Sequence, residues 1–269
     1  MRALFHLLLR ILFRFRAYNT GVLNTPGPVL LLPNHVSWID WLFLVVLMDK
    51  DWKFVVSSTA AQTSWLHRKV MLNDRTFPVD TASPYAVKRM AEYLQTGGRL
   101  VLFPEGRLSR TGSLMKVFDG TGFLLVKTQA KVITCYLRGA LRVPKCEHPG
   151  WKQWFPTVTA HFSEVMTPHK LENVSMAQAR AHMTNWLRDR LVDQQFRVEM
   201  YFGPGNVLAA IAGVARHRPN QIVLEDATAS VLSYRRLLVG ADLMALPLQK
   251  LCAGSTTGVA LTFGNRTPT

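Results

Sequence analysis

The chain is poor in acidic residues, and none occurs before Asp40. Lysine and arginine number 32 against 17 acidic residues, which gives a formal net charge of +15 over 269 residues. An excess of this size predicts an anionic partner, such as nucleic acid, an anionic membrane or a phosphorylated substrate. No Cys/His finger, aromatic RNA-binding motif or block of lysine and arginine is present, so nucleic acid is not expected.

Cysteine is also scarce. Three cysteines without a CxxC pair exclude a disulfide framework and are typical of a reducing compartment. The eight histidines show no spacing typical of metal ligands, so we expect no metal and no cofactor. With 48% hydrophobic and 18% charged residues, the composition favours a folded chain with a sizeable core.

Long uninterrupted apolar runs are absent from the N-terminus. The sequence MRALFHLLLRILFRFRAYN is broken by Arg10, Arg14 and Arg16 and is too short to span a bilayer, which needs about 20 apolar residues. It also lacks the clean core and cleavage site of a signal peptide. Arg10 and Arg14 share one helical face, so we expect residues 1–20 to form an amphipathic helix at an anionic membrane surface. Packing of this helix on the protein itself is the alternative.

Apolar segments and amphipathic stretches alternate along most of the chain. We expect strands at 29–33, 53–57, 99–103, 131–137 and 157–165, and helices at 38–48, 84–95, 120–130 and 175–193. This alternation predicts an α/β domain over residues 21–194, with a mixed, largely parallel sheet flanked by helices. The pattern breaks near 195–206, and residues 203–269 are expected to hold a helix, a strand, a turn and a second helix.

Polar residues interrupt the most apolar stretch, LLLPNHVSWIDWLFLVVLM (30–48). Burial of polar groups without partners costs roughly 2–7 kcal/mol each. Ser37 and Asp40 have the spacing of a helix capping box, which is a purely structural interpretation. We also expect a turn before Trp38 to bring His35 onto Asp40, with one carboxylate oxygen on backbone N–H groups and the other on the imidazole. A histidine held by a carboxylate is the base of acyl-transfer chemistry.

A second candidate motif is LVLFPEGRLSRTG (100–112), a buried strand followed by a turn and two arginines. Gly106 permits a close backbone approach, and the guanidinium of Arg107 or Arg110 is suited to bind phosphate oxygens. A surface turn with solvated arginines is the alternative interpretation.

Together the two motifs resemble the glycerolipid acyltransferases, a family with an H-x4-D motif, over about residues 10–190. The matching residues are Asn34-His35-x4-Asp40 and Phe103-Pro104-Glu105-Gly106. The resemblance implies an O-acyltransferase in which His35 is the general base and Asp40 orients it. The residues then expected to bind substrate are Asn34, Glu105, Gly106, Arg107 and Arg110. With no G-x-S-x-G elbow in the sequence, the nucleophile is expected to be the hydroxyl of the acceptor.

Two departures from the family pattern bear on the acceptor. The third block usually reads F-P-E-G-T-R-S, whereas Arg107 here comes one residue early, and the arginine of the second block is replaced by Thr81, with Arg75 nearby. We therefore expect acyl transfer from acyl carrier protein or acyl-CoA to a lysophospholipid with a phosphodiester headgroup, in particular 2-acylglycerophosphoethanolamine. The alternative acceptor is 1-acylglycerol-3-phosphate.

The segment 207–250 resembles the opening of the adenylate-forming acyl-CoA and acyl-carrier-protein synthetases. The resemblance implies a truncated synthetase domain over 203–269, as in bacterial bifunctional proteins that join the two activities. GSTTG (254–258) lacks the lysine of a nucleotide-binding loop. The expected partners are a lysophospholipid, an acyl thioester, acyl carrier protein and the cytoplasmic face of a bacterial inner membrane. An inactive membrane-binding fragment is the alternative from another functional class.

Overall fold

The computed structural model describes residues 2–58, 73–80, 83, 85–144, 152–203, 205–225 and 231–252. Thr81 and the segment 254–258, which were considered from the sequence, lie outside these residues. The chain forms two compact units, Met1–Glu199 and Met200–Thr269.

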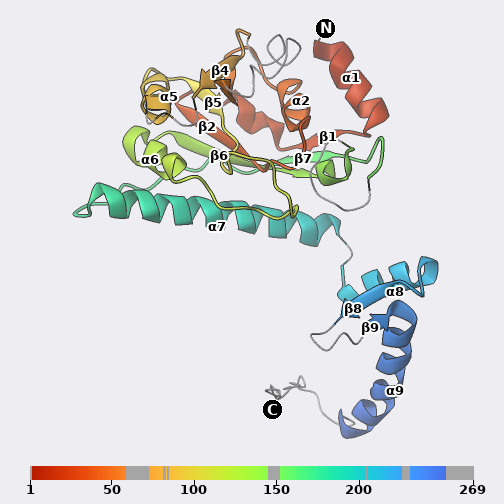
Figure 1. Ribbon diagram of the computed structural model, residues 1–269. Coiled ribbons are helices and arrows are strands. Elements are labelled where there is room, and N and C mark those ends of the chain that lie inside the picture. Colours follow the sequence, from red (N-terminus) through yellow and green to blue (C-terminus); the bar gives the residue numbers. More distant parts are fainter. Residues whose placement is uncertain are drawn as a thin grey trace. The chain divides into compact units, whose positions relative to one another are not determined.

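A seven-stranded sheet forms the centre of the first unit (Figure 1). Its strands are β1 (Arg16–Tyr18), β2 (Val29–Pro33), β3 (Trp52–Ser57), β4 (Thr76–Val79), β5 (Arg99–Val101), β6 (Lys131–Arg138) and β7 (Thr159–Phe162). Their order is β1-β7-β6-β2-β5-β3-β4, and only the β6–β7 pair is antiparallel. The predicted mixed, largely parallel α/β sheet is therefore confirmed.

Strand β2 lies between β5 and β6, and all five of its residues are buried. Successive side chains of a strand point to opposite faces. Val29 and Leu31 accordingly join one hydrophobic layer, while Leu30 and Leu32 join the other. A central strand buried on both faces gives a continuous apolar run, which is how this segment reads in the sequence.

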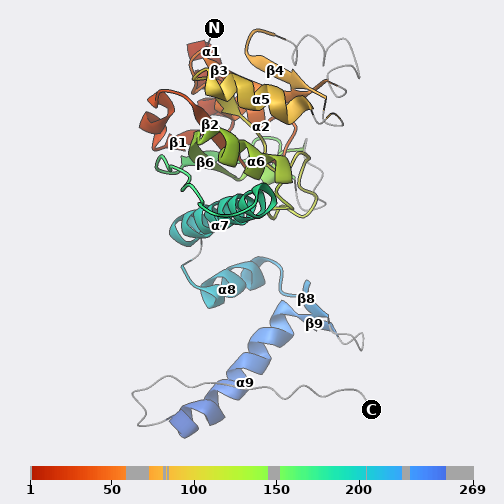
Figure 2. The same ribbon diagram turned by 90° about the vertical axis from the view of Figure 1, so that its left-hand side faces the viewer.

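Helices cover both faces of this sheet. α1 (Arg2–Leu12) and α2 (Asp40–Val45) pack in the layer that contains Leu31. The other layer is covered by α5 (Tyr85–Gln95), α6 (Asp119–Thr128) and α7 (Met176–Phe202). α7 runs alongside α6 in both views (Figures 1 and 2). A Cβ on Gly122 of α6 would overlap Thr184 of α7, so a residue without a side chain allows this close approach.

Several predicted boundaries differ from the structure, among them the strands expected at 99–103 and 157–165, which are Arg99–Val101 and Thr159–Phe162. The N-terminal helix ends at Leu12, and Arg16–Tyr18 pair with β7, so part of the expected segment 1–20 belongs to the sheet. α2 begins at Asp40 and ends at Val45, inside the expected range 38–48. α7 continues to Phe202 because its last turns still contact the sheet: Val198 is buried and Glu199 bonds to side chains of β6.

The second unit consists of α8 (Val207–His217), β8 (Ile222–Glu225), β9 (Val231–Ser233) and α9 (Tyr234–Cys252). β8 and β9 form an antiparallel pair. The second unit therefore has two strands between its helices, where one was expected. The side chain of Asn206 caps α8 by accepting a hydrogen bond from the N–H of Ala209 at 2.8 Å. Among the described residues of this unit whose burial is assigned, only Ala215 is buried, so they form almost no core of their own.

Candidate active site

The two sequence motifs meet at one edge of the sheet. His35 follows β2, the segment 103–107 follows β5, and these neighbouring strands are parallel. The carboxyl ends of parallel strands lie at the same edge, where α/β proteins commonly bind ligands. The rings of His35 and Phe103 stack there, with centroids 4.0 Å apart and an angle of 25° between their planes. The motifs therefore form one site.

Asp40 holds the imidazole of His35. His35 Nδ1 lies 2.9 Å from Asp40 Oδ2. The same oxygen accepts the backbone N–H groups of Val36 at 2.7 Å and Ser37 at 2.8 Å. The Asp40 side chain is fully buried, whereas 19% of the His35 side chain is exposed. A carboxylate on Nδ1 favours the tautomer with its proton there, which leaves the lone pair of Nε2 to accept a proton.

The turn differs in detail from the prediction. One carboxylate oxygen, Oδ2, takes both the imidazole and the backbone N–H groups, while Oδ1 is buried and has no hydrogen-bond partner among the described residues. Half of the expected capping box is present, because Asp40 accepts the N–H of Ser37. The hydroxyl of Ser37 instead accepts the N–H of Ile39 at 3.3 Å. Asp40 therefore stabilises the turn and orients the imidazole at once.

Glu105 ties the second motif to the first. Its Oε1 accepts the backbone N–H of His35 at 3.1 Å, and its Oε2 accepts the N–H of Met115 at 2.8 Å. Burial raises the pKa of Glu105 above its ordinary value, and the two N–H bonds act in the opposite direction. Since each oxygen binds a backbone N–H, Glu105 positions His35 relative to the second motif, and its predicted contact with substrate stays a prediction.

Asn34 also binds backbone. Its side-chain Oδ1 accepts the backbone N–H of Leu137 at 2.7 Å, and its backbone N–H donates to the carbonyl of Cys135 at 3.2 Å. These bonds continue the β2–β6 ladder beyond the end of β2 and fix the residue before His35. The side-chain amide is thus directed at β6, and the predicted contact of Asn34 with substrate stays a prediction.

The glycine and arginines of the second motif lie at the surface. Gly106 has φ +65°, a left-handed conformation that favours glycine. Arg107 and Arg110 are exposed next to it, in keeping with contacts to an anionic substrate. Arg75 is used elsewhere: its guanidinium donates to the carbonyls of Val45, Met48 and Asp49 at the C-terminal end of α2. Such contacts favour a cation near the negative end of the helix dipole.

No activated thiol stands beside His35 among the described residues. Cys135 is buried on β6, and this burial raises the pKa of its thiol far above the ordinary value. Within the same described residues, no group of three or more histidine, cysteine or acidic side chains is placed to hold a metal ion.

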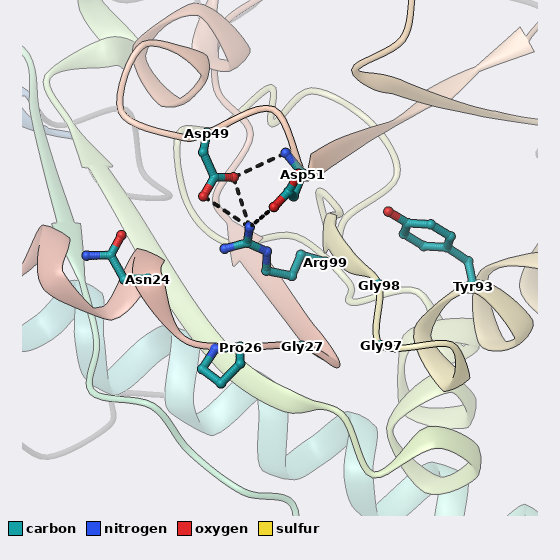
Figure 3. A pocket seen from close by; sticks show the side chains of 9 residues that line it. All are labelled: Asn24, Pro26, Gly27, Asp49, Asp51, Tyr93, Gly97, Gly98 and Arg99. Carbon is teal, nitrogen blue, oxygen red and sulfur yellow. Dashed lines mark hydrogen bonds and ion pairs between the residues drawn. The ribbon is translucent and has the colours of Figure 1, made fainter.

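A cavity of about 520 Å³ lies at the opposite edge of the sheet. Its walls are the amino ends of β2, β3 and β5, and Figure 3 shows its side chains. Arg99 binds Asp49 at 3.0 Å and Asp51 at 2.8 Å there, so its charge is already neutralised. This cavity contains no histidine and is remote from His35, which makes it a structural ion-pair site and not the centre of the chemistry.

Comparisons with known proteins agree with this location. Residues 14–138 match the family model described as acyltransferase, and this range includes both motifs. Residues 14–138 of this chain are thus similar to acyltransferases. The prediction of an O-acyltransferase enzyme is thereby confirmed.

One solved structure similar to this chain is that of the 1-acyl-sn-glycerophosphate (LPA) acyltransferase PlsC from Thermotoga maritima. The match has a TM-score of 0.54 and 16% sequence identity, and it covers 72% of this chain and 78% of that one. At this identity the likeness shows that the fold of the acyltransferase domain is shared.

Proposed function

We propose that this enzyme transfers an acyl group from acyl carrier protein or acyl-CoA to the free hydroxyl of a lysophospholipid. The observation that carries the proposal is the contact between His35 Nδ1 and the buried carboxylate of Asp40. The side chain of His35 is itself partly exposed, so a substrate can approach it. A base of this kind contributes about 10²- to 10⁴-fold to the rate.

The reaction proceeds in two proton transfers around one acyl transfer. Nε2 of His35 takes the proton of the acceptor hydroxyl while the hydroxyl oxygen forms a bond to the carbonyl carbon of the thioester. The C–S bond then breaks, and the thiolate leaves with the proton that His35 held. The buried carboxylate of Asp40 stabilises the imidazolium between these steps.

We propose 2-acylglycerophosphoethanolamine as the acceptor. The support is the pattern of cations: Arg75 is engaged by carbonyl groups of α2, and Arg107 and Arg110 are the exposed arginines of the second motif. A phosphodiester carries one negative charge and needs fewer cations than a phosphomonoester. The similar fold of an LPA acyltransferase keeps 1-acylglycerol-3-phosphate as the second candidate.

We propose that α1 rests on the cytoplasmic face of a bacterial inner membrane. Leu9 and Arg2 of α1 face the protein, since Leu9 is buried and Arg2 donates to the carbonyls of Val46 and Leu47. The outward face is apolar and exposed, the reverse of an ordinary surface helix. Its residues are Leu4, Phe5, Leu7, Leu8 and Ile11. Among the described residues no single helix is long and apolar enough to cross a bilayer, and only α7 and α8 together meet that requirement.

The second unit supports a further part of the proposal, that the chain is related to the bacterial bifunctional 2-acylglycerophosphoethanolamine acyltransferase/acyl-carrier-protein synthetase. It begins and ends with a helix, as expected for the opening of a synthetase domain, and has two strands between the helices where one was expected. An isolated two-stranded hairpin is marginally stable at best, which is in keeping with a segment of a larger domain. The basic surface of the chain would also attract the acidic acyl carrier protein.

The decisive experiment uses the full chain with acyl-ACP or acyl-CoA and a panel of lysolipids. We expect turnover of lysophosphatidylethanolamine that falls at least 100-fold in His35→Ala, and that stays unchanged in His217→Ala, a histidine on the second unit. Faster acylation of lysophosphatidic acid would contradict the proposed acceptor. Vesicle binding without any turnover of the wild type would favour the inactive membrane-binding fragment.

A further inference from the structure

Trp154 and Phe155 form an exposed aromatic pair before β7. Trp154 is 79% exposed and Phe155 is 48% exposed. Tryptophan is on average highly buried in folded proteins, so an indole that projects this far is notable. Its amphipathic ring is suited to the headgroup level of a bilayer, where one part of the ring is apolar and the other meets water.

This pair is fixed to the residues that follow α1. The rings of Phe155 and Phe13 pack edge to face, with centroids 5.5 Å apart. The guanidinium of Arg14 donates to the carbonyl of Phe155 at 3.3 Å and to the hydroxyl of Thr157 at 2.8 Å. The N–H of Val158 also donates to the carbonyl of Phe13 at 3.0 Å. The aromatic pair and the end of α1 therefore hold a fixed relation to each other.

The charge around the pair is positive. No acidic residue precedes Asp40, and Arg10, Arg14 and Arg16 are exposed on or just after α1. The N–H of Gln153, next to Trp154, donates to the carbonyl of Arg142 at 2.8 Å, which brings a further basic residue to the loop. Exposed aromatic side chains among arginines complement the surface of an anionic bilayer, which attracts basic groups and accepts apolar rings.

We propose that Trp154 and Phe155 insert into anionic membranes as a second contact element beside α1. The inference rests on the proposed membrane docking of α1 and extends it to a loop that lies far from α1 in the sequence. Two separate contacts fix the enzyme on the membrane plane more firmly than a single helix, because the second contact forms at high effective concentration once the first is made.

The test measures partition of the full chain onto vesicles of 70% phosphatidylcholine and 30% phosphatidylglycerol by co-sedimentation. The double variant Trp154→Ala/Phe155→Ala is expected to partition at least tenfold more weakly, because two large apolar side chains no longer leave water on binding; a tenfold loss corresponds to about 1.4 kcal/mol. The matched control is Phe196→Ala on α7, whose ring is 63% exposed and which should bind as the wild type does. Turnover of a short-chain lysolipid below its micelle concentration should be unchanged in both variants.

A second measurement reads insertion directly. Lipids brominated near the headgroup should quench part of the tryptophan fluorescence of the wild type, and Trp154→Phe should lose that part while still binding. Wild-type partition of the double variant would overturn the proposal. If Leu7→Asp/Ile11→Asp in α1 abolishes partition and the aromatic variant does not, α1 docking stands and the second contact fails. Absence of turnover with normal vesicle binding would instead refute the acyltransfer proposal alone.

Discussion

Replacing Asp40 with asparagine tests the proposed role of the carboxylate with little change in shape. In the wild type one oxygen accepts three hydrogen bonds, from the imidazole of His35 and from the N–H groups of Val36 and Ser37. The amide oxygen of asparagine can accept the same bonds from the backbone N–H groups, so the turn is kept. The negative charge that stabilises the imidazolium is lost. We expect kcat to fall about 10²- to 10⁴-fold, which corresponds to about 2.7–5.5 kcal/mol in the barrier.

The assay is thiol release from acyl-CoA with lysophosphatidylethanolamine as the acceptor. Asp40→Asn should lower kcat with a nearly unchanged KM, because the carboxylate does not contact either substrate. The matched control is Asp119→Asn, an exposed aspartate at the start of α6, which should keep the wild-type rate. A folded Asp40→Asn enzyme within threefold of the wild-type kcat would refute the reasoning. Asp40→Ala should also destabilise the fold by about 2–6 kcal/mol, because it leaves two buried N–H groups unpaired.

Three further predictions concern the surroundings of the site. Glu105→Gln should lower the free energy of unfolding by about 1–3 kcal/mol, because the NH2 group of the new glutamine faces a backbone N–H, which is also a donor. Denaturant unfolding at neutral pH measures this change, and an unchanged midpoint would contradict it. Gly106→Ala should cost about 1 kcal/mol, because φ is +65°; a gain in thermal stability would contradict the left-handed turn. Burial lowers the pKa of His161 to about 4, with Arg138 acting in the same direction and Glu199 against it. His161 is therefore neutral in the folded state at pH 6.5. As pH falls from about 6.5 to about 4, the unfolded chain binds a proton that the folded chain does not, so the free energy of unfolding falls by about 3 kcal/mol. The loss should be absent in His161→Gln, and an equal loss in that variant would assign the effect to other groups.

The central part of the fold could be predicted because its signals are local. β2 is a buried strand in the middle of the sheet, so its sequence is uniformly apolar, and Pro33 ends it. β1 and β4 could not be found in the same way. They are edge strands of three and four residues, with mostly exposed or half-buried side chains. Their strand conformation comes from pairing with β7 and β3, which are distant in the sequence, and not from their own pattern.

The site divides along the same line. His35 and Asp40 are only five positions apart in the sequence, so spacing was sufficient to predict their contact. The backbone bonds of Asn34 and Glu105 depend on residues that only the folded chain brings near. A motif gives the type of side chain but not the group to which it bonds. The bonds to Leu137 and Met115 could therefore not be predicted from the sequence.

The bonds of Asn34, Glu105 and Asp40 all help to position His35. Asn34, the residue before His35, is bonded to β6. Glu105 accepts the backbone N–H of His35 and so ties it to the turn after β5. Asp40 bonds to the ring itself, so the backbone of His35 and its imidazole are both held in place. A base held this firmly needs little reorganisation when the acceptor hydroxyl arrives, which is the physical condition for efficient proton transfer. Loss of Asn34 or Glu105 should therefore reduce kcat through the position of His35, although neither side chain bonds to the imidazole.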